Sequence, residues 1–311
     1  MPLPSHRRAA AVLLATVFVA LTASATRAAG PRNVRYVDAH SHLFKAMSAD
    51  DEVAAFRKAG VAGVILMWPD PVPLTEIAKK NPGYVLPWIS LSALQGTVVT
   101  DDTAAEFVRA RDVSGFCGFG EMATRLPPPN AQVSDAAIVS DPRRARIYDA
   151  AQAKGTPVNM HVSLVEPETL AAIETIVSSH PRVPFIIAHG GGGIGPDLMG
   201  RLLAAHPNMH FDLSGPLSPP RAGAARPQGA LAADGSLKPD WRAVMERFPD
   251  RFMFAMDTQS VDSVAAIPEK LAAARAAFAP LPLKTEEAIA HGNIERVLKG
   301  CGGLRARYDM R

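Results

Sequence analysis

Two histidines separated by one residue are the first feature of the sequence that could do chemistry. His40 and His42 end a short apolar segment that begins at Tyr36. Alternate side chains of a β-strand point to the same face, so the two imidazoles are expected to face the same way. Neutral imidazole is the commonest protein ligand for zinc-like metals, so the pair could bind one ion. A single pair of this kind is common, and the interpretation depends on partners elsewhere in the chain.

Further polar residues end later apolar segments. A carboxylate that ends an apolar strand needs a partner, because burying an unpaired charge is costly. Each of these residues also has an ordinary structural interpretation: a solvated glutamate at the rim, a hydrogen-bonded core histidine, or an aspartate that caps a turn. Together with the histidine pair, the set predicts a site made of His40, His42, Glu121, His161, His189 and Asp257. The roles of His210, Asp212 and His291 stay open.

These residues must be positioned by a regular alternation of strands and helices. Expected strands cover 34–38, 61–67, 84–91, 113–121, 156–161, 183–188, 209–213 and 252–256. Expected helices cover 49–59, 73–80, 101–111, 141–154, 166–179, 197–205, 240–248, 263–278 and 284–298. Strands that alternate with helices indicate a parallel sheet, and eight strands can close a (β/α)8 TIM barrel. The alternative is an open doubly wound sheet, which would need a glycine-rich phosphate turn after its first strand; 42–45 is not one.

A two-residue period places Cys117, Phe119 and Glu121 on one face of the fourth strand, and Asn159 with His161 on one face of the fifth. Each strand would then deliver its last polar side chain to the carboxyl-terminal mouth of the barrel. Long connections leave the same mouth at 125–140 and 215–238. Arg125 in the first is a candidate for binding a substrate carboxylate or a solvated loop residue, and the second is a candidate lid.

The N-terminal segment has the layout of a secretory signal peptide. Basic residues are followed by an apolar run from Ala9 to about Ala25 and by small residues. The run is shorter than the roughly 20 residues that a spanning helix needs, so cleavage is favoured over a membrane anchor. We expect a signal peptide over 1–29, cut between about residues 25 and 29, and a single domain over 30–311. The mature protein would be periplasmic or secreted, with no membrane contact.

Charge and cysteine content limit the partners. The net charge of +3 falls to +1 after a cut at Ala25, which removes two arginines, and to 0 after a cut at Ala29, which removes a third. A near-neutral protein has no case for a large nucleic-acid-binding patch, so a small-molecule substrate is expected. Cys117 and Cys301 do not form a disulfide framework; export would permit one bridge between them, but Cys117 lies in an expected strand and is expected to be a buried thiol. The oligomeric state is open, a homo-oligomer included.

With these residues in order, the chain resembles the amidohydrolase superfamily, most closely its amidohydrolase-related (amidohydrolase 2) branch. The resemblance covers about residues 36–299 and includes a terminal-helix motif at 293–298. It implies a (β/α)8 barrel and a divalent metal, usually zinc with manganese as an alternative. In one-ion members the ligands would be His40, His42, His161 and Asp257, and His189 would act on the substrate. In two-ion members Glu121 would bridge, as in TatD-like nucleases, and His161 with His189 would hold the second ion.

The resemblance also implies the reaction class. Hydrolysis of an amide, ester or lactone bond would use a metal-activated water, with Asp257 as general base and His189 stabilising charge on the scissile oxygen. The alternative is non-hydrolytic decarboxylation of a small, often aromatic, acid. An exported binding protein without catalysis and a TatD-like nuclease are further alternatives. The sequence names no substrate, because loops decide barrel specificity.

Overall fold

The computed structural model describes residues 32–91, 99–123, 134–218 and 229–299. Contacts divide the chain into two units, Met1–Asn33 and Val34–Arg311, and the fold is that of the second unit. The expected signal peptide over 1–29 and the candidate substrate ligand Arg125 lie outside the described residues, as does the middle of the expected lid. Within the described ranges, no helix has both the length and the apolar character needed to cross a membrane.

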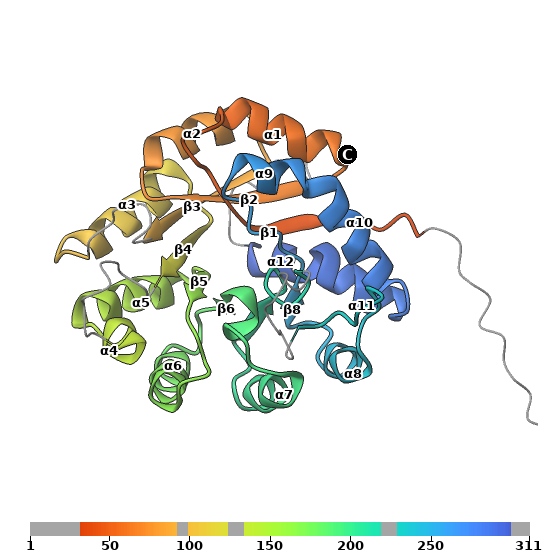
Figure 1. Ribbon diagram of the computed structural model, residues 1–311. Coiled ribbons are helices and arrows are strands. Elements are labelled where there is room, and N and C mark those ends of the chain that lie inside the picture. The colour runs from red at the N-terminus through yellow and green to blue at the C-terminus, as the bar shows by residue number, and fades with distance from the viewer. Residues whose placement is uncertain (1–31, 92–98, 124–133, 219–228, 300–311) are drawn as a thin grey trace, which may run out of the picture. The chain divides into compact units, whose positions relative to one another are not determined.

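The described residues contain eight strands that follow one another in chain order around a single parallel sheet (Figure 1). Nearly every residue of these strands is buried, as expected for a sheet covered on both faces. The strands are β1 (Val37–His42), β2 (Gly63–Trp68), β3 (Val85–Leu91), β4 (Gly118–Ala123), β5 (Val158–His161), β6 (Phe185–Ile187), β7 (Met209–Asp212) and β8 (Phe252–Met253).

The chain that follows β8 brings the sheet back to its first strand. The amide of Ala39 donates to the carbonyl of Phe254 at 3.0 Å, and the amide of His42 donates to the carbonyl of Thr258 at 2.8 Å. Because β8 itself is only two residues long, these bonds to the segment 254–258 nearly close the ring. The described sheet is therefore a nearly closed (β/α)8 barrel, which confirms the predicted fold.

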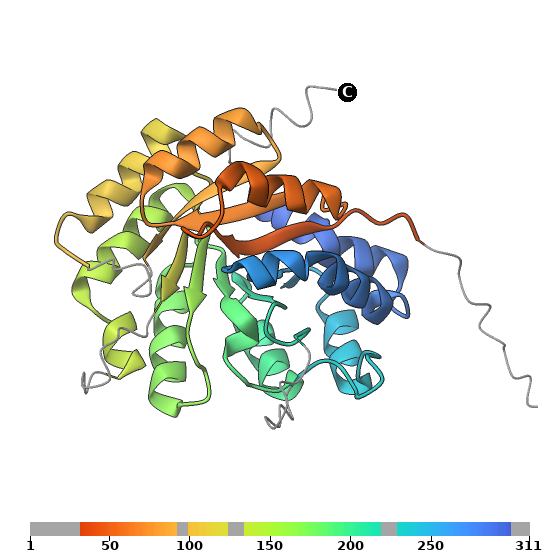
Figure 2. The same cartoon turned by 45° about the horizontal axis from the view of Figure 1, so that its top comes forward.

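Helices cover the outside of the strands (Figure 2). The helix expected from Asp141 begins as predicted, because the Asp141 side chain accepts a hydrogen bond from the amide of Arg143 and proline follows it. The helix expected over 73–80 begins earlier, at Pro71, because Asp70 caps it in the same way. The helices are α1 (Ala49–Lys58), α2 (Pro71–Lys80), α3 (Thr103–Ser114), α4 (Asp135–Val139), α5 (Pro142–Lys154), α6 (Pro167–Ser179), α7 (Pro196–Ala205), α8 (Pro239–Arg247), α9 (Val261–Ala265), α10 (Ile267–Phe278), α11 (Leu283–Glu287) and α12 (Asn293–Val297), with a 3₁₀ turn η2 (Ala188–Gly191) and a π turn η3 (Ala288–Gly292).

Two hydrophobic clusters hold this arrangement together. The larger one packs the outer faces of the strands against the surrounding helices. The smaller one joins strands that are not neighbours in the sheet, so its side chains meet across the barrel interior; it includes Val37, Ile65, Leu86, Ile186 and Met253. Ile294 and Leu298 in and after α12 belong to this inner cluster as well. The inner cluster is the packed floor beneath the polar mouth of the barrel.

Three expectations need correction. The fourth strand starts at Gly118 rather than Val113, because α3 continues to Ser114 and ends at Gly115, whose φ of 75° suits a helix C-cap. The helix expected over 284–298 is broken by the π turn η3. Cys117 is disulfide-bonded and not a free thiol; the other cysteine of the chain lies outside the described residues.

Candidate metal centre

Six polar side chains predicted from the sequence meet at the carboxyl-terminal mouth of the barrel. They come from β1, β4, β5, the η2 turn after β6 and the segment after β8. Three groups of ligand atoms among the described residues could each hold a metal ion. The six predicted residues make up two of them, which share no residue: a first group of His40, His42 and Asp257, and a second group of Glu121, His161 and His189. The third group, His40, His189 and Asp212, takes one histidine from each of these two.

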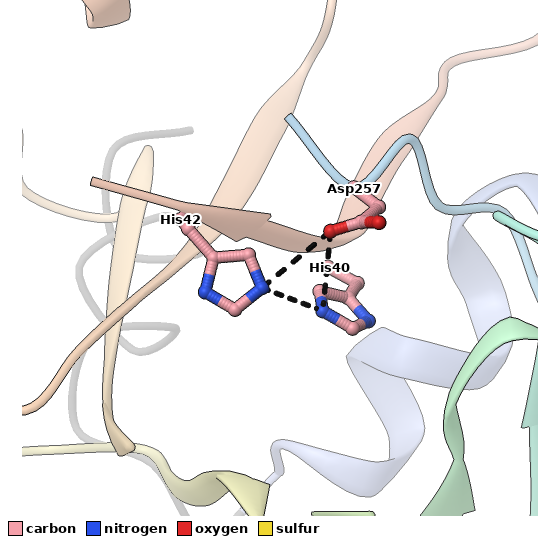
Figure 3. A group of neighbouring side chains, drawn as sticks. All are labelled: His40, His42 and Asp257. Carbon is pink, nitrogen blue, oxygen red and sulfur yellow. Dashed lines mark hydrogen bonds and ion pairs between the residues drawn. The ribbon is translucent and has the colours of Figure 1, made fainter. Parts of the chain in front are cut away.

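The first group lies where β1 meets the segment after β8. His40 and His42 turn their Nε2 atoms toward each other at 3.0 Å, and both face one carboxylate oxygen of Asp257 (Figure 3). Asp257 Oδ1 lies 3.5 Å from His42 Nε2 and 3.8 Å from His40 Nε2. Both histidines are buried, whereas the Asp257 side chain is 22% exposed. The group therefore presents two ring nitrogens and one carboxylate to a common point.

The second group surrounds one oxygen of Glu121. Glu121 Oε1 lies 2.6 Å from His161 Nδ1 and 3.0 Å from His189 Nε2, and these two nitrogens are 3.2 Å apart. The same carboxylate also reaches the first group, because its Oε2 lies 3.5 Å from His42 Nε2 and its Oε1 lies 3.6 Å from His40 Nε2. Glu121 therefore stands between the two groups and approaches atoms of both.

An irregular register in β1 positions the histidine pair. Asp38 pairs with Val64 and Ser41 with Leu66, so two residues of β1 stand opposite a single residue of β2 between these pairs. This is the pattern of a β-bulge, which re-aims side chains next to active sites. It places Asp38 and Ser41 on the same outer side of the strand, while His40 and His42 face the barrel mouth.

A second irregularity, in β4, corrects the expected alternation. Phe119 faces outward, where its ring packs 5.1 Å from that of Phe107 in α3, whereas Glu121 faces inward. Gly120 and Glu121 together stand opposite one residue of β3, so the two-residue period fails at this point. Gly120 has a φ of 145°, and a Cβ there would lie 2.7 Å from the Cβ of Asn159. Glycine is therefore required for the turn that aims Glu121 at the histidines.

Asp257 and His189 have an unusual backbone conformation. Among the described residues they are the non-glycine positions with positive φ, 49° and 53°. Such values are uncommon outside glycine and gather at functional sites. Close packing supports His189, since a Cβ on Gly215 would lie 2.5 Å from its carbonyl oxygen. The sequence predicted both residues at strand ends, but the structure places them in turns just beyond.

Asp212 at the end of β7 is a site residue whose role the sequence left open. It is fully buried, and its Oδ2 accepts a hydrogen bond from His40 Nδ1 at 2.8 Å. Its Oδ1 accepts from the amide of His189 at 2.9 Å and from the hydroxyl of Ser214 at 2.6 Å. Because both oxygens are occupied, we interpret Asp212 as a support for two ligands rather than a ligand. An apolar strand ending in a carboxylate was the signal that could have identified it.

A second support that sequence reasoning missed fixes the turn carrying Asp257. Asp38 accepts from the amide of Met256 at 2.9 Å and from the hydroxyl of Ser41 at 2.6 Å. The same hydroxyl oxygen accepts from the amide of Thr258 at 3.1 Å. The amide of Asp257 donates to the carbonyl of His40 at 2.7 Å. Backbone amides of three consecutive residues, 256–258, are thus bonded to β1.

The electrostatics of the cluster favour a bound cation. Burial alone would lower the pKa of His40, but the negative charges of Asp212 and Glu121 outweigh it and raise that pKa to about 10. Burial alone would raise the pKa of Glu121, but the charge on His40 and hydrogen bonds from His161 and His189 hold it well below its usual range. Protonated imidazole is thus the positive charge that the carboxylates attract. Buried charges in proteins are paired or coordinate metals, so the donor set fits divalent ions.

A pocket of about 780 Å³ opens beside this cluster. His161, His189 and Asp257 line one part of it, and the glycine-rich turn after β6 and the segments after β7 and β8 line the rest. A substrate in this pocket would meet His161, His189 and Asp257. His291 and His210 are not part of the site: His291 bonds to Glu295, and His210 is buried in β7.

Comparisons with known proteins point to one family. A family model described as Amidohydrolase matches residues 37–300. Among solved structures, an uncharacterized TIM-barrel protein from Bordetella bronchiseptica is 15% identical with a TM-score of 0.58, and covers 86% of this chain and 99% of its own. A Burkholderia multivorans amidohydrolase with bound zinc is 18% identical, with a TM-score of 0.52 and coverages of 85% and 99%. Dihydroorotase from Saccharomyces cerevisiae, in complex with 5-fluoroorotic acid, is 15% identical, with a TM-score of 0.51 and coverages of 86% and 84%. No curated protein matches the chain.

Proposed function

Because the chain belongs to the amidohydrolase family of metal-dependent hydrolases, we propose that it cleaves an amide, ester or lactone bond of a small molecule at a centre that holds two divalent ions. The observation that carries this proposal is the position of Glu121 between two separate ligand groups. Its Oε1 contacts the second group at 2.6 and 3.0 Å, and its Oε2 lies 3.5 Å from His42 Nε2. A single carboxylate that reaches both groups supports a shared ligand.

In this proposal each of the six side chains is assigned to one of the two ions or to both. His40, His42 and Asp257 would hold one ion, His161 and His189 would hold the second, and Glu121 would be common to both. The Ser214 hydroxyl donates to Asp212, so His189 Nδ1 donates to Ser214 Oγ at 2.8 Å, which leaves Nε2 to face Glu121. This assignment gives His189 a ligand role in place of the substrate contact that a one-ion site would require. Imidazole and carboxylate donors suit zinc, with manganese as the alternative.

Asp257 is the residue of this set best placed to move a proton. When bound, divalent ions of this kind lower the pKa of a water ligand and polarise a carbonyl oxygen. Asp257 lines the pocket and is partly exposed, so its carboxylate can accept a proton from the attacking water and return it to the leaving group. The left-handed turn, held by Asp38, Ser41 and His40, keeps that carboxylate between the histidines of the ligand groups and the pocket.

Export of the protein is also part of the proposal. The signal-peptide pattern over 1–29 supports it, and so does the disulfide at Cys117, because disulfides persist mainly in oxidising compartments. Mass spectrometry of protein from the periplasm or medium should find a mature N-terminus between residues 25 and 30. An intact N-terminus on all of the protein would contradict export.

The reaction class is tested with a panel of simple amides, esters and lactones. Product acid should form with protein loaded with zinc or manganese, stop after removal of the ions with a chelator, and return when either metal is restored. Acid formation that is insensitive to the chelator would contradict metal-dependent hydrolysis, and so would failure with every bond class.

Non-hydrolytic decarboxylation is the second candidate. The observation that favours it is the group of His40, His42 and Asp257, whose ligand atoms could hold one ion by themselves, with His161 as the further ligand that the one-ion members imply. Release of carbon dioxide from small aromatic acids, with no hydrolysis of the amide, ester and lactone panel, would establish this reaction in place of the first.

A further inference from the structure

The pocket beside the candidate metal centre contains a cation that the proposed reaction does not use. Lys270, in the first turns of α10, lines the pocket and is half-buried. Its Nζ donates to the carbonyl of Met256 at 2.8 Å, the residue immediately before Asp257. The ammonium group is therefore fixed to the backbone of the turn that carries the proposed general base.

Lys270 keeps donor capacity after making that bond. An ammonium group has three N–H donors and no acceptor, and this one uses a single donor. Among the described residues, no carboxylate lies within ion-pair distance of Nζ and no other hydrogen bond is made by it. Half-burial of a charge without a counterion is unfavourable, so an anion in the pocket would complete this environment.

The other polar side chains of the pocket are less available. Four serines line it, but the hydroxyl of each already donates to a neighbour. Their acceptors are Asp212 for Ser214, the Ser214 carbonyl for Ser218, the Ser263 hydroxyl for Ser260 and the Ser260 carbonyl for Ser263. Gln259 makes a long contact of 3.4 Å with Asp257. Of the described side chains that line the pocket, Lys270 is thus the one with a full positive charge that is not assigned to the metal centre.

From this arrangement we infer that the substrate carries a carboxylate in addition to the bond that is cleaved, and that Lys270 binds this carboxylate. One lysine supplies one positive charge, which matches a carboxylate better than a phosphate dianion. The peptide plane fixes the Met256 carbonyl oxygen close to the Cα of Asp257, so Nζ lies within about 6 Å of that Cα. The second carboxylate would therefore lie near the reacting bond, as in a compact acid. The inference rests on the proposed function, because it gives the substrate class of the same site.

Binding of product-like acids tests the inference without relying on turnover. Hydrolysis leaves a carboxylate, so a diacid resembles the product of a substrate with a second carboxylate. Calorimetry with zinc-loaded protein would compare succinate, glutarate and adipate with their monomethyl esters. At least one diacid should bind about tenfold more tightly than its ester, the effect expected of a hydrogen bond to a charged group. Equal binding of every pair, or no binding of any acid by protein that holds zinc, would overturn the inference.

Variants at Lys270 separate the effect of its positive charge from that of its hydrogen bond to the Met256 carbonyl. Lys270→Gln keeps a donor near the Met256 carbonyl but removes the charge, so the preference for the diacid should vanish while zinc content is retained. Lys270→Arg should keep the preference. Lys284→Gln, at an exposed position of α11, is the matched control and should behave as wild type. A preference that survives in Lys270→Gln would contradict the inference. A wild-type protein that takes up no zinc would instead refute the proposed function.

Discussion

His40 Nδ1 lies 2.8 Å from Asp212 Oδ2, and this contact determines which nitrogen of His40 can face an ion. A carboxylate only accepts hydrogen bonds, so Nδ1 must carry a proton, and Nε2 is the nitrogen left to face His42 and an ion. A buried carboxylate behind a metal-ligating histidine is the usual way in which proteins fix that tautomer.

We predict that Asp212→Asn weakens metal binding by about 10–100-fold, the usual effect of losing such a partner. An amide cannot accept from both His40 and the His189 amide, because one of its two sides is a donor. Competition with a chromophoric chelator measures the affinity directly. Wild-type affinity in this variant would show that Asp212 does not orient His40.

Ser41 connects β1 to the turn that carries Asp257, since its hydroxyl donates to Asp38 and accepts from Thr258. Ser41→Ala should lower kcat about tenfold with KM and metal content little changed, because the proposed base loses its fixed position. The free energy of unfolding should fall by about 1–2 kcal/mol, the cost of the lost hydrogen bonds. Ser179→Ala, at an exposed site in α6, is the control. An equal loss of kcat in both variants would contradict a positioning role.

The carboxylate of Asp257 is predicted to act as the base. Asp257→Asn should reduce kcat by about 10²–10⁴-fold, the usual contribution of general acid–base catalysis, while the remaining ligands retain much of the metal. Steady-state kinetics and elemental analysis on the same sample separate the two effects. Asp262→Asn on the exposed side of α9 serves as the control. Near-normal turnover in Asp257→Asn would exclude the role.

How much of this site the sequence predicts depends on the backbone around each residue. His40 and His42 remain on one face because they lie two positions apart in a continuous strand. Glu121 was correctly predicted to face the barrel mouth, but Phe119 was wrongly placed on the same face, since the irregular register at Gly120 is a tertiary feature that no two-residue period reveals. Ser41 was passed over because serine carries no chemical signal until the turn at Thr258 is folded against it.

The barrel itself followed from the alternation of apolar strands and capped helices, which is a local property. Its closing contacts could not be predicted in the same way. The eighth strand is two residues long, and the ring closes through the segment 254–258, whose amides and carbonyls find partners only once β1 is beside them.

His210 gives the fold a pH dependence that is separate from the metal centre. Burial is the main reason that the pKa of His210 is lowered to about 4, and the positive charges of Arg251 and Arg296 lower it further. The negative charge of Asp250 acts in the opposite direction. The imidazole is neutral in the folded protein, so below pH 6.5 the unfolded chain takes up a proton that the folded chain does not, and stability falls until about pH 4.

Urea unfolding of metal-free protein tests the predicted contribution of His210 to the pH dependence of stability. Between pH 7 and pH 5 the wild type should lose about 2 kcal/mol more stability than His210→Phe, which cannot titrate at that position. Equal losses would show that the pKa of His210 is not lowered in the folded protein.

The most direct test of the account is the number of metal ions per chain. Protein purified without chelators, loaded with zinc or manganese and freed of excess metal, can be analysed by inductively coupled plasma mass spectrometry. The position of Glu121 between the two ligand groups predicts two ions per chain in the wild type and fewer in Glu121→Gln. A wild-type chain that holds one ion or none at saturation would contradict the shared-ligand site.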